Sequence, residues 1–371
     1  MIVRLLEKNI QKWMFKRKAI LITGARQVGK TTLINDFLNK QPYPILKLNG
    51  DDTITKRLFE VPSISKFSQL IGNNKILFID EAQQIENIGL CLKIIFDNLP
   101  EVQIIATGSS ALDIADKVFE PLTGRHFLYH LYPFSMSELY TGNLLKFTEN
   151  LNWHLVYGYY PDVVTHPNDA KKYLKSIANQ YLYKDVLAWK DIRKPELLDK
   201  LLQLLAHQIG NEVSTNELAN QLKVKSETVE SYLDLLEKSF VIFRLKSYVT
   251  NERKEVTKMK KIYFWDVGIR NAIIDNFNTI EVRMDKGVLF ENFVIADRMK
   301  KNHYLENDIK SYFWRSFQKQ EIDYIEWDNG KLFGNEIKWN PNKKMTKSFE
   351  NMYPNSVNQI IHPDNVFSYL S

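Results

Sequence analysis

A glycine-rich run near the N-terminus has the composition and spacing of a phosphate-binding loop. Residues 24–31 read Gly-Ala-Arg-Gln-Val-Gly-Lys-Thr and satisfy the pattern G-x-x-x-x-G-K-[ST] at each fixed position. Backbone N–H groups of such a loop close around a phosphate, and the following helix N-terminus adds partial positive charge. Lys30 would neutralise the β- and γ-phosphates, and the Thr31 hydroxyl would ligate Mg2+. The residues predicted to contact the nucleotide are Gly24, Ala25, Arg26, Gln27, Val28, Gly29, Lys30, Thr31 and Thr32.

Two adjacent acids, Asp80 and Glu81, follow the apolar run 75–79. A nucleoside triphosphatase needs one acid to hold the Mg2+ shell and a second to polarise the attacking water. Asp80 suits the first role, as a ligand of the metal and the nucleotide, and Glu81 suits the second. An apolar run ending in Asp-Glu is common by itself, and its position after a phosphate-binding loop gives it weight.

Further polar residues could complete this site. Thr107, Ser109 and Ser110 follow a third apolar run and are candidates to orient the water, although each could equally be a helix cap. Arg125 is a candidate to reach the γ-phosphate, either in cis or from a neighbouring subunit. The alternative for Arg125 is an ordinary surface arginine.

The elements that must position these residues read as a parallel sheet. Residues 19–23 are predicted to form a buried strand, residues 32–38 a helix, and residues 75–80 and 102–107 further strands. Parallel strands deliver polar residues to the same carboxyl edge of a sheet. The fold class predicted for residues 1–140 is therefore α/β, a parallel-sheet P-loop domain.

A third set of candidate residues surrounds Asn329-Gly330, a pair that indicates a tight β-hairpin turn. A two-residue turn places Asp323 opposite Glu336, and Glu321 opposite Lys338, all on one face. Apolar residues fall on the other face, which is predicted to be the core face. Facing carboxylates destabilise a hairpin unless a cation lies between them. A three-residue turn would shift this register by one.

Asp323 followed by Glu336-Ile337-Lys338 resembles the active-site pattern of PD-(D/E)xK nucleases. The resemblance implies that Asp323 and Glu336 bind Mg2+ and that Lys338 is catalytic, positioning water and stabilising charge. Glu291, an acid within the otherwise apolar run 288–296, matches the helix acid of that metal site. Trp314-Arg315 would begin the preceding strand. A solvated hairpin with a Glu321–Lys338 surface pair, and a degenerate nuclease fold kept for binding, are the alternatives.

The region between these sites has a helical pattern. Residues 141–195 are predicted to form a helical lid or linker, and residues 196–255 a winged helix-turn-helix, with a capping box from Ser214 to Glu217. The third helix of this region, residues 226–237, carries four acids and no base. Acids are repelled by DNA phosphates, so a structural or protein-contacting winged helix is preferred to DNA reading. The basic run 253–261 is interpreted as a solvated loop, with contact to a nucleic-acid backbone as the alternative.

Segments 24–32, 77–83, 104–114 and 121–139 together resemble a large prokaryotic family of AAA-type ATPases of poorly defined function. That family joins an AAA-like N-terminal module to a C-terminal domain similar to restriction endonucleases, here residues 256–371. The resemblance implies ATP and Mg2+ as cofactors and ATP hydrolysis as an activity. It leaves two uses open: control of a DNA-cutting domain, or nucleotide-dependent binding of partners. DNA, a protein partner and other copies of the chain are the candidate partners.

The composition sets broad limits. The chain has 371 residues, too many for one ordinary domain, and its 44% hydrophobic and 25% charged residues are a soluble globular balance. No apolar run is long enough to cross a membrane, and residues 1–8 read as an amphipathic helix rather than a signal peptide. The single Cys91 cannot form a disulfide within the chain, so a cytoplasmic location is expected. The net charge of +6 permits nucleic-acid binding without arguing for it.

Overall fold

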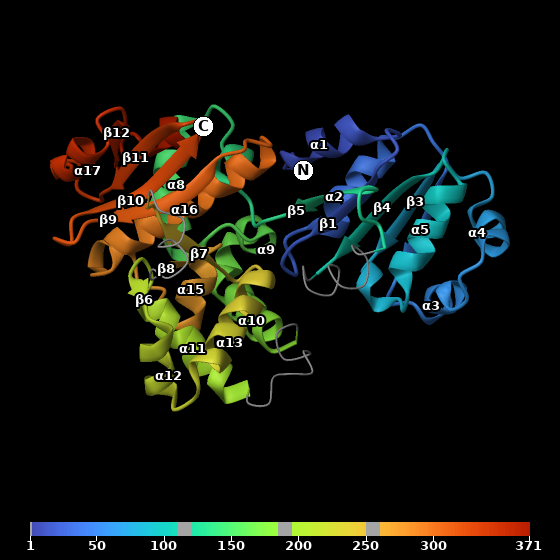
Figure 1. The fold of residues 1–371 in the computed structure, drawn as a ribbon, viewed down its shortest axis with the longest axis horizontal. Helices are drawn as coiled ribbons and strands as arrows, with labels where there is room; N and C mark the ends of the chain where they lie inside the picture. Colours follow the sequence, from blue (N-terminus) through green and yellow to red (C-terminus); the bar gives the residue numbers. More distant parts are fainter. Residues whose placement is uncertain (1, 110–120, 185–194, 250–259) are drawn as a thin grey trace. The chain divides into compact units, whose positions relative to one another are not determined.

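The computed structural model describes residues 2–109, 121–184, 195–249 and 260–371, and the chain folds into two compact units (Figure 1). Unit 1 comprises Met1–Tyr132 and Lys238–Phe240, and unit 2 comprises Pro133–Glu237 and Val241–Ser371. The chain thus passes from unit 1 to unit 2 after Tyr132, and the domain boundary predicted at residue 140 stays a prediction. Ser110 and most of the predicted basic loop lie outside the described residues. Among the helices that the structure describes, none is long and apolar enough to cross a membrane.

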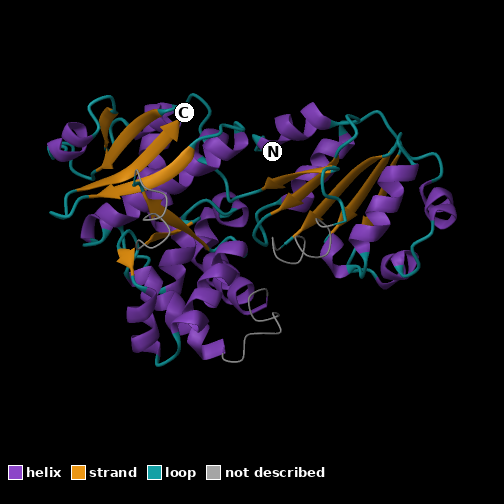
Figure 2. Ribbon diagram, in the orientation of Figure 1, coloured by secondary structure: helices purple, strands orange, loops and turns teal. Residues whose placement is uncertain are grey.

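Unit 1 is built on a parallel five-stranded sheet in the order β2-β3-β4-β1-β5. Its strands are β1 (Ala19–Thr23), β2 (Ile45–Asn49), β3 (Ile76–Asp80), β4 (Gln103–Gly108) and β5 (His126–His130). Its helices are α1 (Leu6–Trp13), α2 (Lys30–Asn39), α3 (Thr53–Phe59), α4 (Ile64–Ile71) and α5 (Ile88–Asn98). Helices flank this sheet (Figure 2), and β1 and β4 are buried along their whole length. Burial on both faces explains why these strands read as continuous apolar runs.

The order of the strands decides which residues of unit 1 meet. Because all five strands are parallel, β1, β3 and β4 end at the same edge of the sheet, and β4 lies between the other two. This edge carries the loop after Thr23, the acid Asp80 and the polar residue Thr107. The predicted α/β parallel-sheet fold of the N-terminal region is confirmed.

Unit 2 contains a mixed seven-stranded sheet in the order β12-β11-β10-β9-β7-β8-β6. Its strands are β6 (Glu212–Val213), β7 (Ile242–Ser247), β8 (Lys260–Phe264), β9 (Lys310–Arg315), β10 (Glu321–Asp328), β11 (Lys331–Ile337) and β12 (Val357–Ile361). The parallel pairing of β7 with β9 joins the predicted winged-helix and C-terminal regions in one sheet. The three domains predicted after residue 140 lie largely within one compact unit, and the division among them stays a prediction.

The helices of unit 2 largely follow the predicted pattern. They are α7 (Met136–Leu139), α8 (Leu144–Tyr157), α9 (Pro161–Thr165), α10 (Ala170–Lys184), α11 (Pro195–His207), α12 (Thr215–Leu222), α13 (Ser226–Lys238), α15 (Val267–Ile273), α16 (Lys286–Tyr304), α17 (Lys347–Met352) and α18 (Val366–Leu370). The hydroxyl of Ser214 accepts a hydrogen bond from the Glu217 N–H at 3.3 Å and so begins α12, as predicted. The last residue of α13, Lys238, belongs to unit 1.

The C-terminal hairpin has the predicted register. Asn329 and Gly330 both have positive φ, 47° and 84°, and the pairs run from Asp328 with Lys331 to Tyr324 with Asn335. Two details differ from the prediction. Residues 314–315 end β9 rather than begin it, and the acidic face is buried as well as the apolar face.

Burial of the acidic face excludes one alternative for the hairpin, the solvated surface hairpin. Asp323 is only 4% exposed and Glu336 only 7%. Glu321 and Lys338 do not pair with each other and instead bind other partners. The solvated hairpin is therefore wrong, and these buried acids need a compensating positive charge.

Candidate nucleotide site and carboxylate cluster

The loop between β1 and α2 needs glycine at two positions. Gly29 has φ 91°, in the left-handed region that favours glycine, immediately before α2 begins. A Cβ at Gly24 would lie 2.1 Å from the carbonyl oxygen of Leu131, so the two backbones approach too closely for any side chain. The predicted loop thus has the strand-loop-helix setting that phosphate binding requires. The other predicted nucleotide contacts lie in the same loop and the first turn of α2 (Ala25, Arg26, Gln27, Val28 and Thr32).

The ammonium of Lys30 lies against the backbone of this loop. Its Nζ donates to the carbonyl oxygens of Gly24 at 2.8 Å and Ala25 at 2.9 Å, and the residue is 5% exposed. A positive charge is therefore held at the loop whose N–H groups would surround a phosphate.

Asp80 joins two elements at the carboxyl edge of the sheet. Its Oδ2 accepts a hydrogen bond of 2.8 Å from the Thr31 hydroxyl, and its Oδ1 accepts one from the Thr107 hydroxyl. The three residues come from β3, α2 and β4, so the fold brings together positions far apart in the sequence. Carboxylate and hydroxyl oxygens are hard ligands of the kind that Mg2+ prefers. Thr107, predicted as a residue that orients water, contacts this acid.

Glu81 follows directly and is fixed by a residue that sequence reasoning missed. Its backbone has φ 47°, and its Oε2 accepts a 2.6 Å hydrogen bond from Gln83 Nε2. The same amide nitrogen lies 3.1 Å from Ser109 Oγ. Gln83 is only 3% exposed, so its amide holds the Glu81 carboxylate in one orientation. The signal that could have found it is the sequence Asp-Glu-Ala-Gln, in which it stands two residues after the acid.

Arg4 is a second contact that the sequence did not reveal. Its guanidinium, 6% exposed, donates to the carbonyl oxygens of Val28 at 3.0 Å and Tyr132 at 2.6 Å. It thereby ties the phosphate-binding loop to the chain that follows β5. A single arginine just before α1 carries no sequence signal for this role.

The cis role predicted for Arg125 is wrong. Its carbonyl oxygen accepts a hydrogen bond from the N–H of Ala19, the first residue of β1, whereas the phosphate-binding loop follows the last residue, Thr23. At roughly 3.3 Å per strand residue, about 13 Å of sheet separate the two ends. The guanidinium instead pairs with Asp97 at 2.8 Å. Arg125 therefore lies at the edge of the sheet opposite the candidate nucleotide site.

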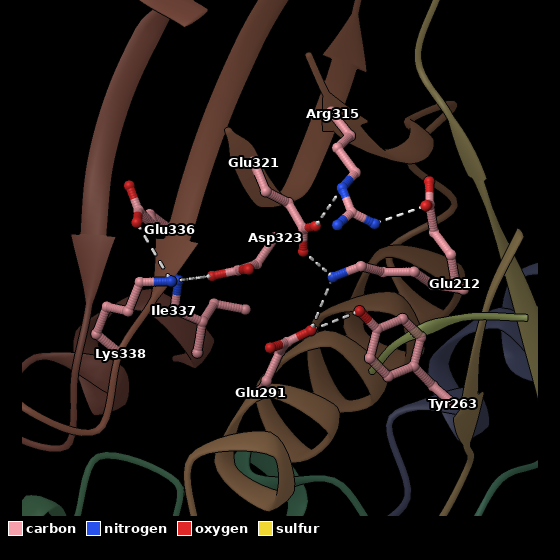
Figure 3. Close-up of polar contacts among 10 residues, drawn as sticks. Glu212, Tyr263, Glu291, Arg315, Glu321, Asp323, Glu336, Ile337 and Lys338 are labelled. Atoms are coloured by element: carbon pink, nitrogen blue, oxygen red, sulfur yellow. Dashed lines mark hydrogen bonds and ion pairs between the residues drawn. The ribbon is translucent and has the colours of Figure 1, made fainter. Parts of the chain in front are cut away.

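A cluster of buried acids lies within unit 2, on and beside the hairpin (Figure 3). Lys338 Nζ is 2.9 Å from Asp323 Oδ2 and 3.2 Å from Glu336 Oε1. The N–H of Ile337 donates to the same Asp323 oxygen at 2.7 Å. The lysine therefore bridges the two carboxylates that were predicted to share a metal ion.

Glu291 of α16 has different partners. Its Oε1 accepts a hydrogen bond of 2.6 Å from the Tyr263 hydroxyl and lies 3.3 Å from Lys261 Nζ. Lys261 also forms an ion pair with Glu321, which Arg315 approaches at 3.6 Å. Across the described part of the chain, no group of three or more His, Cys, Asp or Glu side chains has the geometry of a metal site. The predicted ligands thus lie in one region, but lysines stand among them.

Burial and charge set the ionisation of this cluster. Burial raises the pKa of Glu291 above its usual range, an effect that the nearby Lys261 charge opposes. Burial alone would lower the pKa of Lys261, but Glu291, Asp323 and Glu321 outweigh it, and that pKa is raised. The pKa of Lys338 is likewise raised because Asp323 and Glu336 outweigh its burial. Both lysines therefore carry positive charge at neutral pH.

The acids of α13 have an intramolecular partner that the sequence did not reveal. Arg244 of β7 donates to Glu230 at 2.6 Å and to Glu237 at 2.7 Å, and it also pairs with Asp234. Only 12% of the Arg244 side chain is exposed, whereas the three acids remain partly exposed. Arg244 and Lys260, whose Nζ lies 3.8 Å from Glu230, supply two positive charges against three negative ones, so this helix face keeps an acidic character.

Comparison with known proteins assigns a class to unit 1. Residues 16–140 match the family model of an AAA domain. Residues 148–279 and 286–366 match models described as domains of unknown function, DUF8612 and DUF4143. Together with the loop geometry and the oxygen-lined edge, the first match makes unit 1 an AAA-type P-loop ATPase domain.

Two relatives match over most of the chain. An uncharacterized protein of Methanocaldococcus jannaschii is 28% identical over 337 residues, covering 78% of this chain and 70% of that protein. An uncharacterized protein of Mycobacterium tuberculosis is 27% identical over 346 residues, covering 92% of this chain and 74% of that protein. Among solved structures, the Walker-type ATPase of Pyrococcus abyssi is similar in fold, with a TM-score of 0.50, 17% identity, and coverage of 74% of this chain and 96% of that chain.

Proposed function

We propose that unit 1 binds ATP together with Mg2+ and hydrolyses it, with Glu81 as the general base. The observation that carries this proposal is the 2.8 Å hydrogen bond between the Thr31 hydroxyl and Asp80. It joins the helix that follows the phosphate-binding loop to the acidic end of β3, so a metal ion bound to both would touch the phosphates.

Each residue of the proposed site has a separate task. Thr31 and Asp80 would hold Mg2+, which when bound neutralises charge on the phosphates. Lys30 would bind phosphate oxygens. Glu81, oriented by the amide of Gln83 at 2.6 Å, would accept a proton from the attacking water. Ser109, in contact with the same amide, would help to place that water.

The test uses the full chain and replaces one of two lysines, Lys30 at the start of α2 or Lys40 directly after its end. Lys30→Ala should abolish ATP binding in a titration with a fluorescent ATP analogue. Lys40→Ala is the matched control, because its ammonium pairs with Glu7 at 2.8 Å and Asp36 at 3.0 Å rather than with the loop. Unchanged ATP affinity in Lys30→Ala would contradict the proposed site.

We further propose that the nucleotide state controls what unit 2 binds. Support comes from Lys238–Phe240, which belongs to unit 1 although its neighbours in the chain belong to unit 2. The Phe240 ring lies 5.2 Å from the His130 ring, whose Nδ1 is 2.7 Å from the Thr23 hydroxyl at the end of β1. Contacts therefore lead from the strand before the phosphate-binding loop to the end of α13.

The partner of unit 2 in this proposal is a protein. We assign α11, α12, α13 and β7 to a winged helix, since three helices followed by a strand are what the sequence pattern predicts for it. The acids on α13 disfavour contact with DNA phosphates, because Arg244 offsets only part of their charge. A basic partner surface fits this helix better than a nucleic acid does.

Metal-dependent cleavage of DNA is a second candidate function. It is favoured by one observation, the close approach of Lys338 to Asp323 and Glu336 at 2.9 and 3.2 Å. Incubation of the full chain with plasmid DNA and Mg2+ or Mn2+, with and without ATP, tests it. Cleavage that Asp323→Asn abolishes would establish this function, and intact DNA under all conditions would leave the nucleotide-controlled switch.

A further inference from the structure

Lys261 occupies an unusual place in unit 2. It lies on β8 and is 1% exposed, although a lysine side chain normally keeps its ammonium in water. Its Nζ forms an ion pair with Glu321 of β10 and lies 3.3 Å from Glu291 of α16. Three separate elements thus direct their charged groups to one buried point.

The carboxylates around this point require a positive charge. Glu291 is 9% exposed and Asp323 4%, and buried carboxylates without a cation are strongly destabilising. Glu291, Glu321 and Asp323 approach one another from α16 and β10 (Figure 3). Lys338 is already engaged with Asp323 and Glu336, so it does not replace Lys261 beside Glu291.

We infer that the Lys261 ammonium is the resident cation of this cluster, held where a divalent ion would otherwise bind among Glu291, Glu321 and Asp323. Carboxylate oxygens bind Mg2+ and Mn2+. With the Lys261 ammonium in place these carboxylates do not have the geometry of a metal site, and the chain supplies its own single charge instead of an ion. Unit 2 therefore folds without a metal in this cluster. This inference does not depend on whether unit 1 hydrolyses ATP.

A gain of metal binding tests the inference. In full-length Lys261→Met the cavity left by the ammonium is lined by carboxylates, so the variant should bind one more Mn2+ per chain than the parent. Free Mn2+ is measured by electron paramagnetic resonance in a titration without nucleotide. Both proteins share unit 1, so the difference between them reports the cluster. The melting temperature of the variant should fall without metal and rise again with millimolar Mn2+.

Two further variants make the result specific. Lys260→Met removes a lysine from the next position of the same strand, where Nζ lies 3.8 Å from Glu230 and the side chain is 34% exposed. It should bind no additional Mn2+. Lys261→Met combined with Glu291→Gln removes one of the proposed ligands, and it should lose the added binding while folding without metal.

The outcomes that overturn the inference are distinct. One is a Lys261→Met chain that binds no more Mn2+ than the parent. Another is a Lys261→Met chain that stays unfolded in millimolar Mn2+ while the double variant folds. A third is a parent protein whose bound Mn2+ falls when Glu291→Gln alone is introduced, because the cluster would then already hold a metal beside Lys261.

Discussion

The carboxylate of Glu81 is the group whose replacement separates binding from hydrolysis. Glu81→Gln keeps the size of the side chain but cannot accept a proton, so ATP hydrolysis should fall roughly 10²-fold or more. ATP binding should persist, because Lys30, Thr31 and Asp80 are unchanged. Steady-state phosphate release and nucleotide titration measure the two effects.

A nearby glutamate supplies the control for this variant. Glu86 is exposed and lies beyond the short 3-10 turn at Ala82–Gln84, so Glu86→Gln should hydrolyse ATP at the parent rate. Parent-like hydrolysis by Glu81→Gln would place the base elsewhere in the site.

Asp297 should make the stability of unit 2 depend on pH. Burial raises its pKa from 3.8 to about 6, with Lys300 and the Met136 N–H opposing the rise. The native state therefore holds this proton more tightly than the unfolded chain. The stabilisation that this proton gives to the native state is complete below pH 4, where both states bind it, and is lost as the pH rises through about 6.

The variant Asp297→Asn isolates this effect, because an amide cannot ionise and its oxygen can still accept the Met136 N–H hydrogen bond of 2.9 Å. Between pH 4 and 7 the parent should lose about 3 kcal/mol of unfolding free energy relative to the variant. Urea unfolding of both proteins at several pH values measures the difference. If the unfolding free energies of parent and variant change with pH in parallel, Asp297 has the same pKa in the native and unfolded states, which would contradict the prediction.

Residues that act through a contiguous motif could be predicted from the sequence, and residues that act through long-range contacts could not. The loop from Gly24 to Thr31 and the Asp80-Glu81 pair each carry their chemistry in adjacent positions. Arg4 acts through the carbonyl of Val28, 24 residues away, so no local pattern marks it. The presence of Lys261 among the acids depends on the meeting of β8, β10 and α16, which the spacing of the acids alone does not specify.

At the scale of elements, the same substitution should have opposite effects in a turn and in a helix. Gly330 has φ 84° in the hairpin turn, and a Cβ added there would meet only open space, so Gly330→Ala should cost about 1 kcal/mol or more through backbone strain alone. Gly287 also has open space but lies in α16, so Gly287→Ala should stabilise by up to about 1 kcal/mol. Thermal unfolding of the two variants measures both shifts, and equal signs would contradict the turn assignment.

Local elements were predicted well because their signals are local. The Asn-Gly pair set the register of β10 and β11, and the buried strands read as apolar runs. The pairing of β7 with β9 could not be predicted, because it joins strands from two different predicted domains. The burial of the acidic hairpin face could not be predicted for the same reason, since its neighbours Lys261 and Glu291 come from other parts of the chain.

At the scale of the whole molecule, the proposed switch predicts that nucleotide binding is felt in both units. ATP with Mg2+ should slow amide hydrogen exchange in the phosphate-binding loop of unit 1 and also change exchange in α13 of unit 2. The reason is the contact series from Thr23 through His130 to Phe240. Exchange measured by mass spectrometry on the full chain gives both readings at once.

The variant that cannot bind nucleotide is the control for this experiment. Lys30→Ala should show neither change when ATP and Mg2+ are added. Slower exchange confined to unit 1 in the parent would contradict the switch and leave the ATPase domain without an effect on its neighbour.

The return of the chain to unit 1 at Lys238–Phe240 has a consequence for inheritance. A domain encoded by one uninterrupted stretch of a gene can be duplicated, lost or fused to a new neighbour by a single recombination event. Unit 1 cannot be moved in this way, because part of it is encoded inside the stretch for unit 2. A gene truncated after Tyr132 would yield an ATPase domain in which the rings of His130 and Tyr132 lack Phe240, 5.2 and 6.0 Å away. Genes that descend from an ancestor with this interleaved arrangement should therefore keep both units together.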